Sequence, residues 1–237
     1  MKSEHFYDED NADPSDEIIG GVIKSPLQFF SQIISALDIT IPNPEASIDN
    51  PPTSWTEEQQ DFYNFFHKFC NNTFFPRTGM NVFSPDSVAG YHADYQGPDY
   101  DRSWFSSNSI VARYRTIESL IAGKNRILGL LTGAQGGSYF QNIWIQFNPV
   151  EFVANPNYIS NPYDSTVLVT DLVELLFCES LSEARINYFA QSLFDINPDY
   201  WSEAWAMYVN NGNEVQVKIR LDALFTKLIN AAEFQLM

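Results

Sequence analysis

The sequence predicts a mostly α-helical protein, an irregular multi-helix bundle with a long structured loop layer and little or no β-sheet. Apolar side chains recur at helical spacing in several stretches, and 44% of the 237 residues are apolar against 18% charged. Only residues 139–147 alternate as a strand would, and one strand cannot form a stable sheet. We therefore expect a single helical domain over residues 1–237 with a sizeable core.

The first helix is predicted to begin at Pro26. Ser25 can cap a free backbone N–H, Pro26 needs no donor in the first turn, and Gln28 can reach back to the cap. Apolar residues then repeat at helical spacing as far as Leu37. Four prolines between residues 40 and 53 forbid a continuous helix there, so this stretch is the best candidate for an internal linker.

A second helix is predicted to open with one of two capping pairs, Ser54 with Glu57 or Thr56 with Gln59. Its phenylalanines fall on one stripe, as is typical of a core-facing helix. From residue 73 to 106 Gly, Pro, Asn, Asp and Tyr predominate, which predicts a long loop that is functional or packed as an irregular layer. The stripe residues are Phe62, Phe65, Phe66 and Phe69.

The spacing predicts a further helix over about residues 110–121, stopped by Gly123, and three or four more after Pro162. Both cysteines, Cys70 and Cys178, stand beside apolar residues and are interpreted as small buried hydrophobes, with a long-range disulfide left open. The later helices are predicted at about 165–178, 183–194, 199–210 and 214–232.

Charge excludes one class of partner. The chain has 13 basic and 30 acidic residues, a formal net charge of −17. Nucleic-acid binding depends on Lys and Arg that neutralise phosphates, so nucleic acid is not expected as a partner. No stretch has the ~20 consecutive apolar residues of a membrane span, and the acidic start MKSEHFYDED is unlike a signal peptide, so neither is expected.

Catalytic motifs are missing from the sequence. It holds no G-x-S-x-G, phosphate-loop, G-x-G-x-x-G or H-E-x-x-H pattern, and its three histidines lie in separate segments. His92 and Asp86, in the long loop, are the candidate acid or base. Asp94, Asp99 and Asp101 are candidate calcium ligands, with the alternative that they cap turns. No metal site and no cofactor is predicted.

Aromatic and arginine side chains gather in and after the same loop. Aromatic faces stack on sugars and other planar groups, and arginine binds carboxylate, sulfate or phosphate through paired hydrogen bonds. The structural alternative is that Trp104 pins the loop to the helices, while Arg113 pairs with a buried acid or with loop carbonyls. The candidate ligand-binding residues are Tyr91, Arg102, Trp104, Arg113 and Arg115.

Several of these residues belong to a recognisable pattern. The run GMNVFSPDSVAGY at 79–91, then Arg102-Ser103-Trp104 and SIVARY at 109–114, resembles the bacterial family called domain of unknown function 1800. The stretches SEHFYDEDN and IIGGVIKSPLQFF, and the closing helix from Ile219 to Leu236, resemble the same family. The resemblance covers nearly the whole chain but only the later, C-terminal part of the family's usual length, and so implies a truncated or split copy.

The resemblance implies a secreted or periplasmic bacterial protein and carries no established activity. We therefore expect a non-enzymatic extracytoplasmic binding or interaction module, with residues 79–115 as the recognition face toward a protein partner or a surface carbohydrate. One alternative is an enzyme, or the accessory half of one, acting on an anionic sugar, sulfated or uronic. Arg102, Arg113 and Arg115 would then hold the anion. Another alternative is an inactive truncated fragment.

Overall fold

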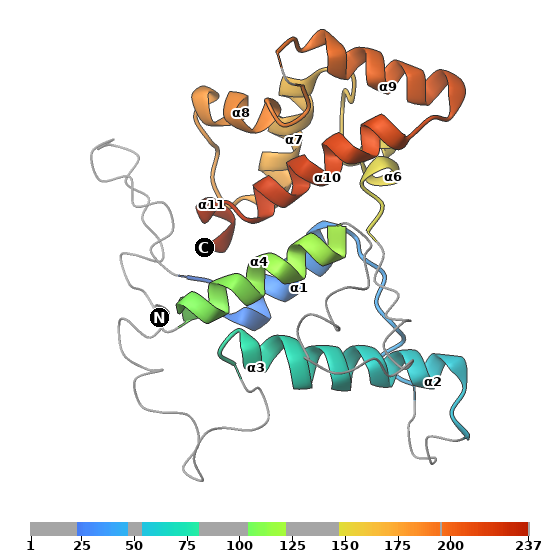
Figure 1. The fold of residues 1–237 in the computed structure, drawn as a ribbon, viewed down its shortest axis with the longest axis vertical. Coiled ribbons are helices and arrows are strands. Elements are labelled where there is room, and N and C mark those ends of the chain that lie inside the picture. Colours follow the sequence, from blue (N-terminus) through green and yellow to red (C-terminus); the bar gives the residue numbers. More distant parts are fainter. Residues whose placement is uncertain (1–22, 47–53, 81–103, 122–146, 195, 237) are drawn as a thin grey trace. The chain divides into compact units, whose positions relative to one another are not determined.

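The computed structural model describes residues 23–46, 54–80, 104–121, 147–194 and 196–236, and these are helical with no β-sheet among them (Figure 1). The predicted mostly α class is confirmed. The chain divides into two compact units, one of residues 23–147 and one that contains residues 148–237. We call them the first and second unit in the order of these ranges. The single domain and the linker at 40–53 stay predictions.

Helix α1 spans Pro26–Ala36 and begins where its capping residues predict. The backbone N–H of Gln28 donates to Oγ of Ser25 at 3.3 Å, and the backbone N–H of Ser25 donates to Oε1 of the Gln28 side chain at 2.9 Å. These reciprocal bonds satisfy two backbone donors that the first helical turn leaves without partners. The start of this helix is therefore specified by local hydrogen bonds between residues three positions apart.

The second helix opens with the Thr56 and Gln59 capping pair as α2, Glu57–Phe62. It continues as a π-helix over Tyr63–Phe74 and ends as α3, Phe75–Arg77. Within the π-helix, Oγ1 of Thr73 donates to the carbonyl of Lys68 at 2.8 Å. Neither the wider winding nor the continuation past residue 73 was predicted, because apolar spacing does not distinguish a π-helix from an α-helix.

The core of the first unit is built on the ring of Phe30 in α1. Phe65, Phe69, Phe74 and Phe75 all place their ring centroids within 4.9–6.2 Å of it. These five rings are buried. Of the predicted stripe, Phe62 and Phe66 lie at the margin with intermediate exposure. The phenylalanine stripe is therefore a core element on one side and part of the surface on the other.

Helix α4 covers Ser107–Ile121, three residues longer at its start than predicted. The Ser106 amide donates to Oγ of Ser109 at 2.8 Å, and the Ser109 amide donates to Oγ of Ser106 at 3.1 Å. This pair of serines supplies a reciprocal cap of the same kind as that of α1. Glutamate or glutamine at the third helical position is the usual signal, so a Ser–Ser cap was not recognised in the sequence.

The second unit is organised around α10, Val215–Ile229, which packs against α6, α8, α9 and α11. The other helices are α6 (Pro149–Ala154), α7 (Ser165–Leu176), α8 (Glu183–Ala190), α9 (Asp199–Asn211) and α11 (Ala232–Gln235). Helix α7 packs against α8. Residues buried in this core include Leu168, Leu172, Phe189, Trp201, Trp205, Leu221, Phe225, Leu228 and Phe234.

Helices α7, α8, α9 and α10 confirm the predicted pattern after Pro162, although α8 ends at Ala190 instead of 194. Gly212 closes α9 in the left-handed region with φ of 69°, a conformation that glycine adopts without strain. Short helix α6 was not predicted. Its cap is Asn148, whose Oδ1 accepts from the amide of Val150 at 3.1 Å.

The cysteine prediction is half wrong. Cys70 is buried as expected, but Cys178 is exposed, and both are free thiols. The apolar periodicity of residues 165–178 runs past the true end of the helix. Helix α7 stops at Leu176, and Phe177 takes an extended backbone conformation, so Cys178 lies beyond the buried stripe.

Candidate functional site

The predicted site residues fall into two groups. Within the described residues are Trp104, Arg113 and Arg115, all in the first unit on or next to α4. Arg113 and Arg115 lie on α4 itself, and Trp104 lies just before its first residue. Outside the described residues lie the candidate acid or base residues His92 and Asp86, the ligand-binding candidates Tyr91 and Arg102, and the calcium candidates Asp94, Asp99 and Asp101.

Trp104 anchors the start of α4. Its side chain is buried, and its carbonyl accepts a hydrogen bond of 2.6 Å from Oγ of Ser109. A Cβ atom placed on Gly79, which has φ of 92°, would lie 3.9 Å from Cε3 of the Trp104 ring. Gly79 follows the end of α3, and α3 packs against α4. Gly79 and Trp104 therefore lie next to each other, although residues 81–103 separate them in the sequence.

Arg113 is completely buried in the first unit. Its Nη2 donates to the backbone carbonyl of Lys24 at 2.7 Å, next to the cap of α1. The guanidinium carbon lies 5.0 Å from the ring centroid of Phe29 and 5.1 Å from that of Phe105. Burial lowers the pKa of Arg113 to about 10, because removing this cation from water disfavours its charged form. The two rings and the carbonyl offset part of that cost.

Arg113 thus joins α4 to the chain that enters α1. The structural alternative predicted that Arg113 pairs with a buried acid or with carbonyls of the long loop. The acceptor is a backbone carbonyl, but it belongs to Lys24, outside that loop. The ligand-binding role of Arg113, like that of buried Trp104, stays a prediction. Arg115 differs from both because its side chain is exposed. Three predicted ligand residues close in sequence therefore divide into two buried anchors and one surface cation.

The exposed side of α4 carries an aromatic, an aliphatic and a cationic side chain. Val111 is 44% exposed and Tyr114 37% exposed, and Arg115 is exposed beside them. Positions 111, 114 and 115 share one helix face because they are three and four residues apart. We call these three residues the α4 face.

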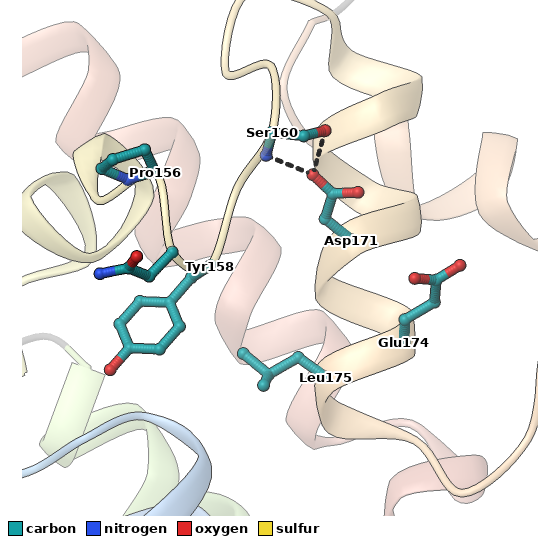
Figure 2. Close-up of a pocket in the computed structure, with 7 residues that line it drawn as sticks. Pro156, Tyr158, Ser160, Asp171, Glu174 and Leu175 are labelled. Atoms are coloured by element: carbon teal, nitrogen blue, oxygen red, sulfur yellow. Dashed lines mark hydrogen bonds between the residues drawn. The ribbon is translucent and has the colours of Figure 1, made fainter.

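A pocket of about 340 Å³ lies in the second unit, between the chain that follows α6 and helix α7 (Figure 2). Ser160 closes one side of it. The backbone amide of Ser160 donates to Oδ2 of Asp171 at 2.6 Å, and its hydroxyl donates to the same oxygen at 2.8 Å. We call this the α7 pocket. Its walls are formed by Pro156, Asn157, Tyr158, Ser160, Asp171, Glu174 and Leu175.

Phe152 packs against Tyr158, the aromatic residue in the wall of the α7 pocket. The ring of Tyr158 stacks on buried Phe152 with centroids 4.6 Å apart and planes 10° from parallel. Phe152 thereby fixes the orientation of Tyr158 relative to α7. Glu174 stands on the exposed side of α7, three residues after Asp171, so that both carboxylates lie on one helix face.

The sequence alone does not predict this pocket. One signal was available, since Asp171 and Glu174 share a face of the helix predicted at 165–178. The return of Ser160 onto Asp171, eleven positions away, is a tertiary contact that the spacing of α7 does not encode. In the part of the chain that the structure describes, no group of three or more His, Cys, Asp or Glu side chains is placed to hold a metal ion.

These features define an all-helical protein with a buried Trp–Arg anchor beneath a surface helix in one unit and an open pocket in the other. The family described as "Protein of unknown function (DUF1800)" matches residues 1–236. The chain belongs to this family. Neither the curated proteins nor the solved structures give a significant match to it. Each helix within the described segments is too short or too polar to cross a lipid bilayer.

Proposed function

We propose that the chain is a non-enzymatic binding module that works outside the cytoplasm and recognises a surface carbohydrate or a protein partner through residues 79–115. The observation that carries this proposal is the division of α4 into a buried anchor side, with Arg113, and the exposed α4 face. The extracytoplasmic location rests on the family resemblance alone.

Rigid support is what a recognition surface needs, because side chains that are already fixed lose less entropy on binding. Buried Trp104 and Arg113 hold the base of α4 against α1 and α3. Tyr114 then presents an amphipathic ring and Arg115 a planar cation, the side-chain types that contribute most at binding surfaces. A carbohydrate or protein surface with acceptor groups suits this pair.

An enzyme acting on a sulfated or uronic sugar is the second candidate. In such an enzyme, the anionic group of the sugar would be held by Arg102, Arg113 and Arg115. Arg113 has no exposed surface and already donates to the Lys24 carbonyl, which leaves Arg115 as the exposed arginine of α4. The burial of Arg113 thus favours the binding module.

The test is an array of bacterial surface polysaccharides and of sulfated and uronic oligosaccharides, probed with the full chain and with two variants. Tyr114→Ala and Arg115→Ala should each weaken binding to the responding glycan by about 5-fold or more, the usual loss at an energetically important contact. Tyr200→Ala is the matched control, because Tyr200 is 51% exposed but lies on α9 of the second unit. Trp104 is unsuitable as a probe because its removal would disturb the fold.

Each other outcome contradicts the proposal. Equal binding by all variants would place recognition away from the α4 face. Release of sulfate or of new reducing ends from the bound oligosaccharide would favour the enzyme. Absence of any glycan response, together with no binding to a panel of purified periplasmic proteins, would favour the inactive fragment.

A further inference from the structure

We propose that the α7 pocket binds an organic cation, an ammonium or guanidinium group carried on an aliphatic stem. This site lies in the second unit and is independent of the recognition face proposed above. It combines two uncompensated carboxylates with an aromatic ring and an apolar wall in one cavity of about 340 Å³.

The carboxylates of the α7 pocket still have acceptor capacity. Ser160 occupies Oδ2 of Asp171 with two hydrogen bonds, and within the described residues neither Oδ1 of Asp171 nor the Glu174 carboxylate has a hydrogen bond or an ion pair. Ionised carboxylates accept and do not donate. A ligand that fits this wall must therefore bring donors, and a cationic donor forms the stronger bond.

Among the described residues of the second unit, no basic side chain is placed to neutralise this pair. Each of the four basic residues between 148 and 237 contacts another group: a carboxylate in two cases and a backbone carbonyl in the other two. The local charge at the pocket stays negative, which raises the concentration of cations there. The pairs are Arg185 with Glu233, Lys218 with Asp222, Arg220 with the Leu193 carbonyl and Lys227 with the Tyr188 carbonyl.

The rest of the wall selects an organic cation over a metal ion. Tyr158 contributes its ring to the wall, and Phe152 stacks on this ring. A cation over an aromatic face is attracted by the ring quadrupole. Leu175 and Pro156 give an aliphatic stem apolar surface to cover (Figure 2). Calcium takes six to eight oxygen ligands, more than this wall supplies.

Two kinds of ligand carry such a cation: a free alkylamine, and the lysine or arginine side chain of a peptide. The experiment titrates the full ¹⁵N-labelled chain at physiological ionic strength with n-butylammonium and, separately, with Nα-acetyl-lysine methylamide. Amide shifts are expected at residues 157–160 and 171–175. Tighter binding of the lysine derivative would identify a peptide as the source, and equal binding would identify the free amine.

The variant Glu174→Gln keeps the shape of the side chain and removes its charge. We expect it to weaken binding of n-butylammonium by about 2–5-fold, the value of an exposed ion pair. Glu203→Gln is the matched control, because Glu203 is an exposed acid on α9, outside the pocket. It should bind as the unchanged chain does. Because Glu174 is exposed, its replacement is expected to leave the fold intact, which the rest of the amide spectrum verifies directly.

Three results would overturn the proposal. If n-butanol produced the same shifts as n-butylammonium, the pocket would be an apolar surface without charge selection. If calcium chloride shifted the same amides at lower concentration and displaced the amine, the site would be a metal site. If Glu174→Gln and Glu203→Gln weakened binding equally, the attraction would come from the net charge of the whole chain.

Discussion

At the scale of single residues, burial gives the two cysteines different chemistry. The thiol of Cys70 lies in the first unit, where burial raises its pKa to about 12. The thiolate is the reactive form, so Cys70 is inert near neutral pH. Cys178 is exposed just after α7 and is open to reagents in solution. One chain thus carries a protected thiol and an accessible one.

This difference predicts a count of reactive thiols. At about pH 8 the native chain should react rapidly with a disulfide reagent such as Ellman's at one site, and the unfolded chain at two. The variant Cys178→Ser should lose the rapid phase, while Cys70→Ser should retain it. A rapid phase that survives in Cys178→Ser would show that Cys70 is accessible in the folded chain.

At the scale of elements, a charged pair fastens α11 to α8. Nε and Nη2 of Arg185 donate to the two carboxylate oxygens of Glu233 at 2.6 and 3.0 Å. The guanidinium carbon also lies 4.8 Å from the ring centroid of Tyr188 and 4.7 Å from that of Phe189. Burial by itself would raise the pKa of Glu233, but the hydrogen bond and the charge of Arg185 outweigh it, and the pKa is lowered.

The lowered pKa fixes the sign of a pH effect. The folded state holds Glu233 ionised to a lower pH than the unfolded state does, so the stabilisation is present at pH 7. It is lost as the pH falls through the lowered pKa, below the usual value of 4.5. At pH 7, Glu233→Gln should reduce the free energy of unfolding by about 1 kcal/mol, and the difference should shrink toward pH 3. Urea unfolding at both pH values measures it.

A second ion pair in the same unit supplies the control. Lys218 and Asp222 lie 3.3 Å apart, one turn from each other on α10, with a single short contact. Lys218→Gln should cost only about 0.3 kcal/mol at pH 7. If Glu233→Gln cost no more than Lys218→Gln, the bidentate geometry would not be contributing to the attachment of α11.

The sequence predicted the start of a helix correctly where the capping side chains lie close together along the chain. The caps at Ser25 and Thr56 depend on side chains three residues apart, and both form as expected. The π-helical winding of Tyr63–Phe74 has no such signature, and it was missed. The same distinction holds for the candidate sites. Residue type alone made Trp104, Arg113 and Arg115 candidate ligand-binding residues. Tertiary packing decides that Trp104 and Arg113 are buried and that Arg115 is exposed.

At the scale of the whole molecule, charge works against folding. A formal net charge of −17 on 237 residues means that compaction brings many carboxylates closer together. Salt screens this repulsion over distances of about 10 Å at 0.1 M. The melting temperature should therefore rise by about 2–5 °C between low salt and 0.2 M sodium chloride.

The helical circular dichroism signal follows this melt directly. Potassium fluoride at the same ionic strength is the control, because screening depends on ion concentration and not on ion identity. An equal rise in both salts is expected. A melting temperature that stays constant or falls with salt would mean that specific pairs such as Arg185 with Glu233 outweigh the general repulsion.

The meeting of Gly79 and Trp104 has a consequence for how this protein can change over evolutionary time. Because Gly79 lies beside the Trp104 ring, the entropic cost of joining these two positions depends only weakly on how many residues connect them. Insertions or deletions between residues 81 and 103 therefore add little to the entropic cost of folding this unit.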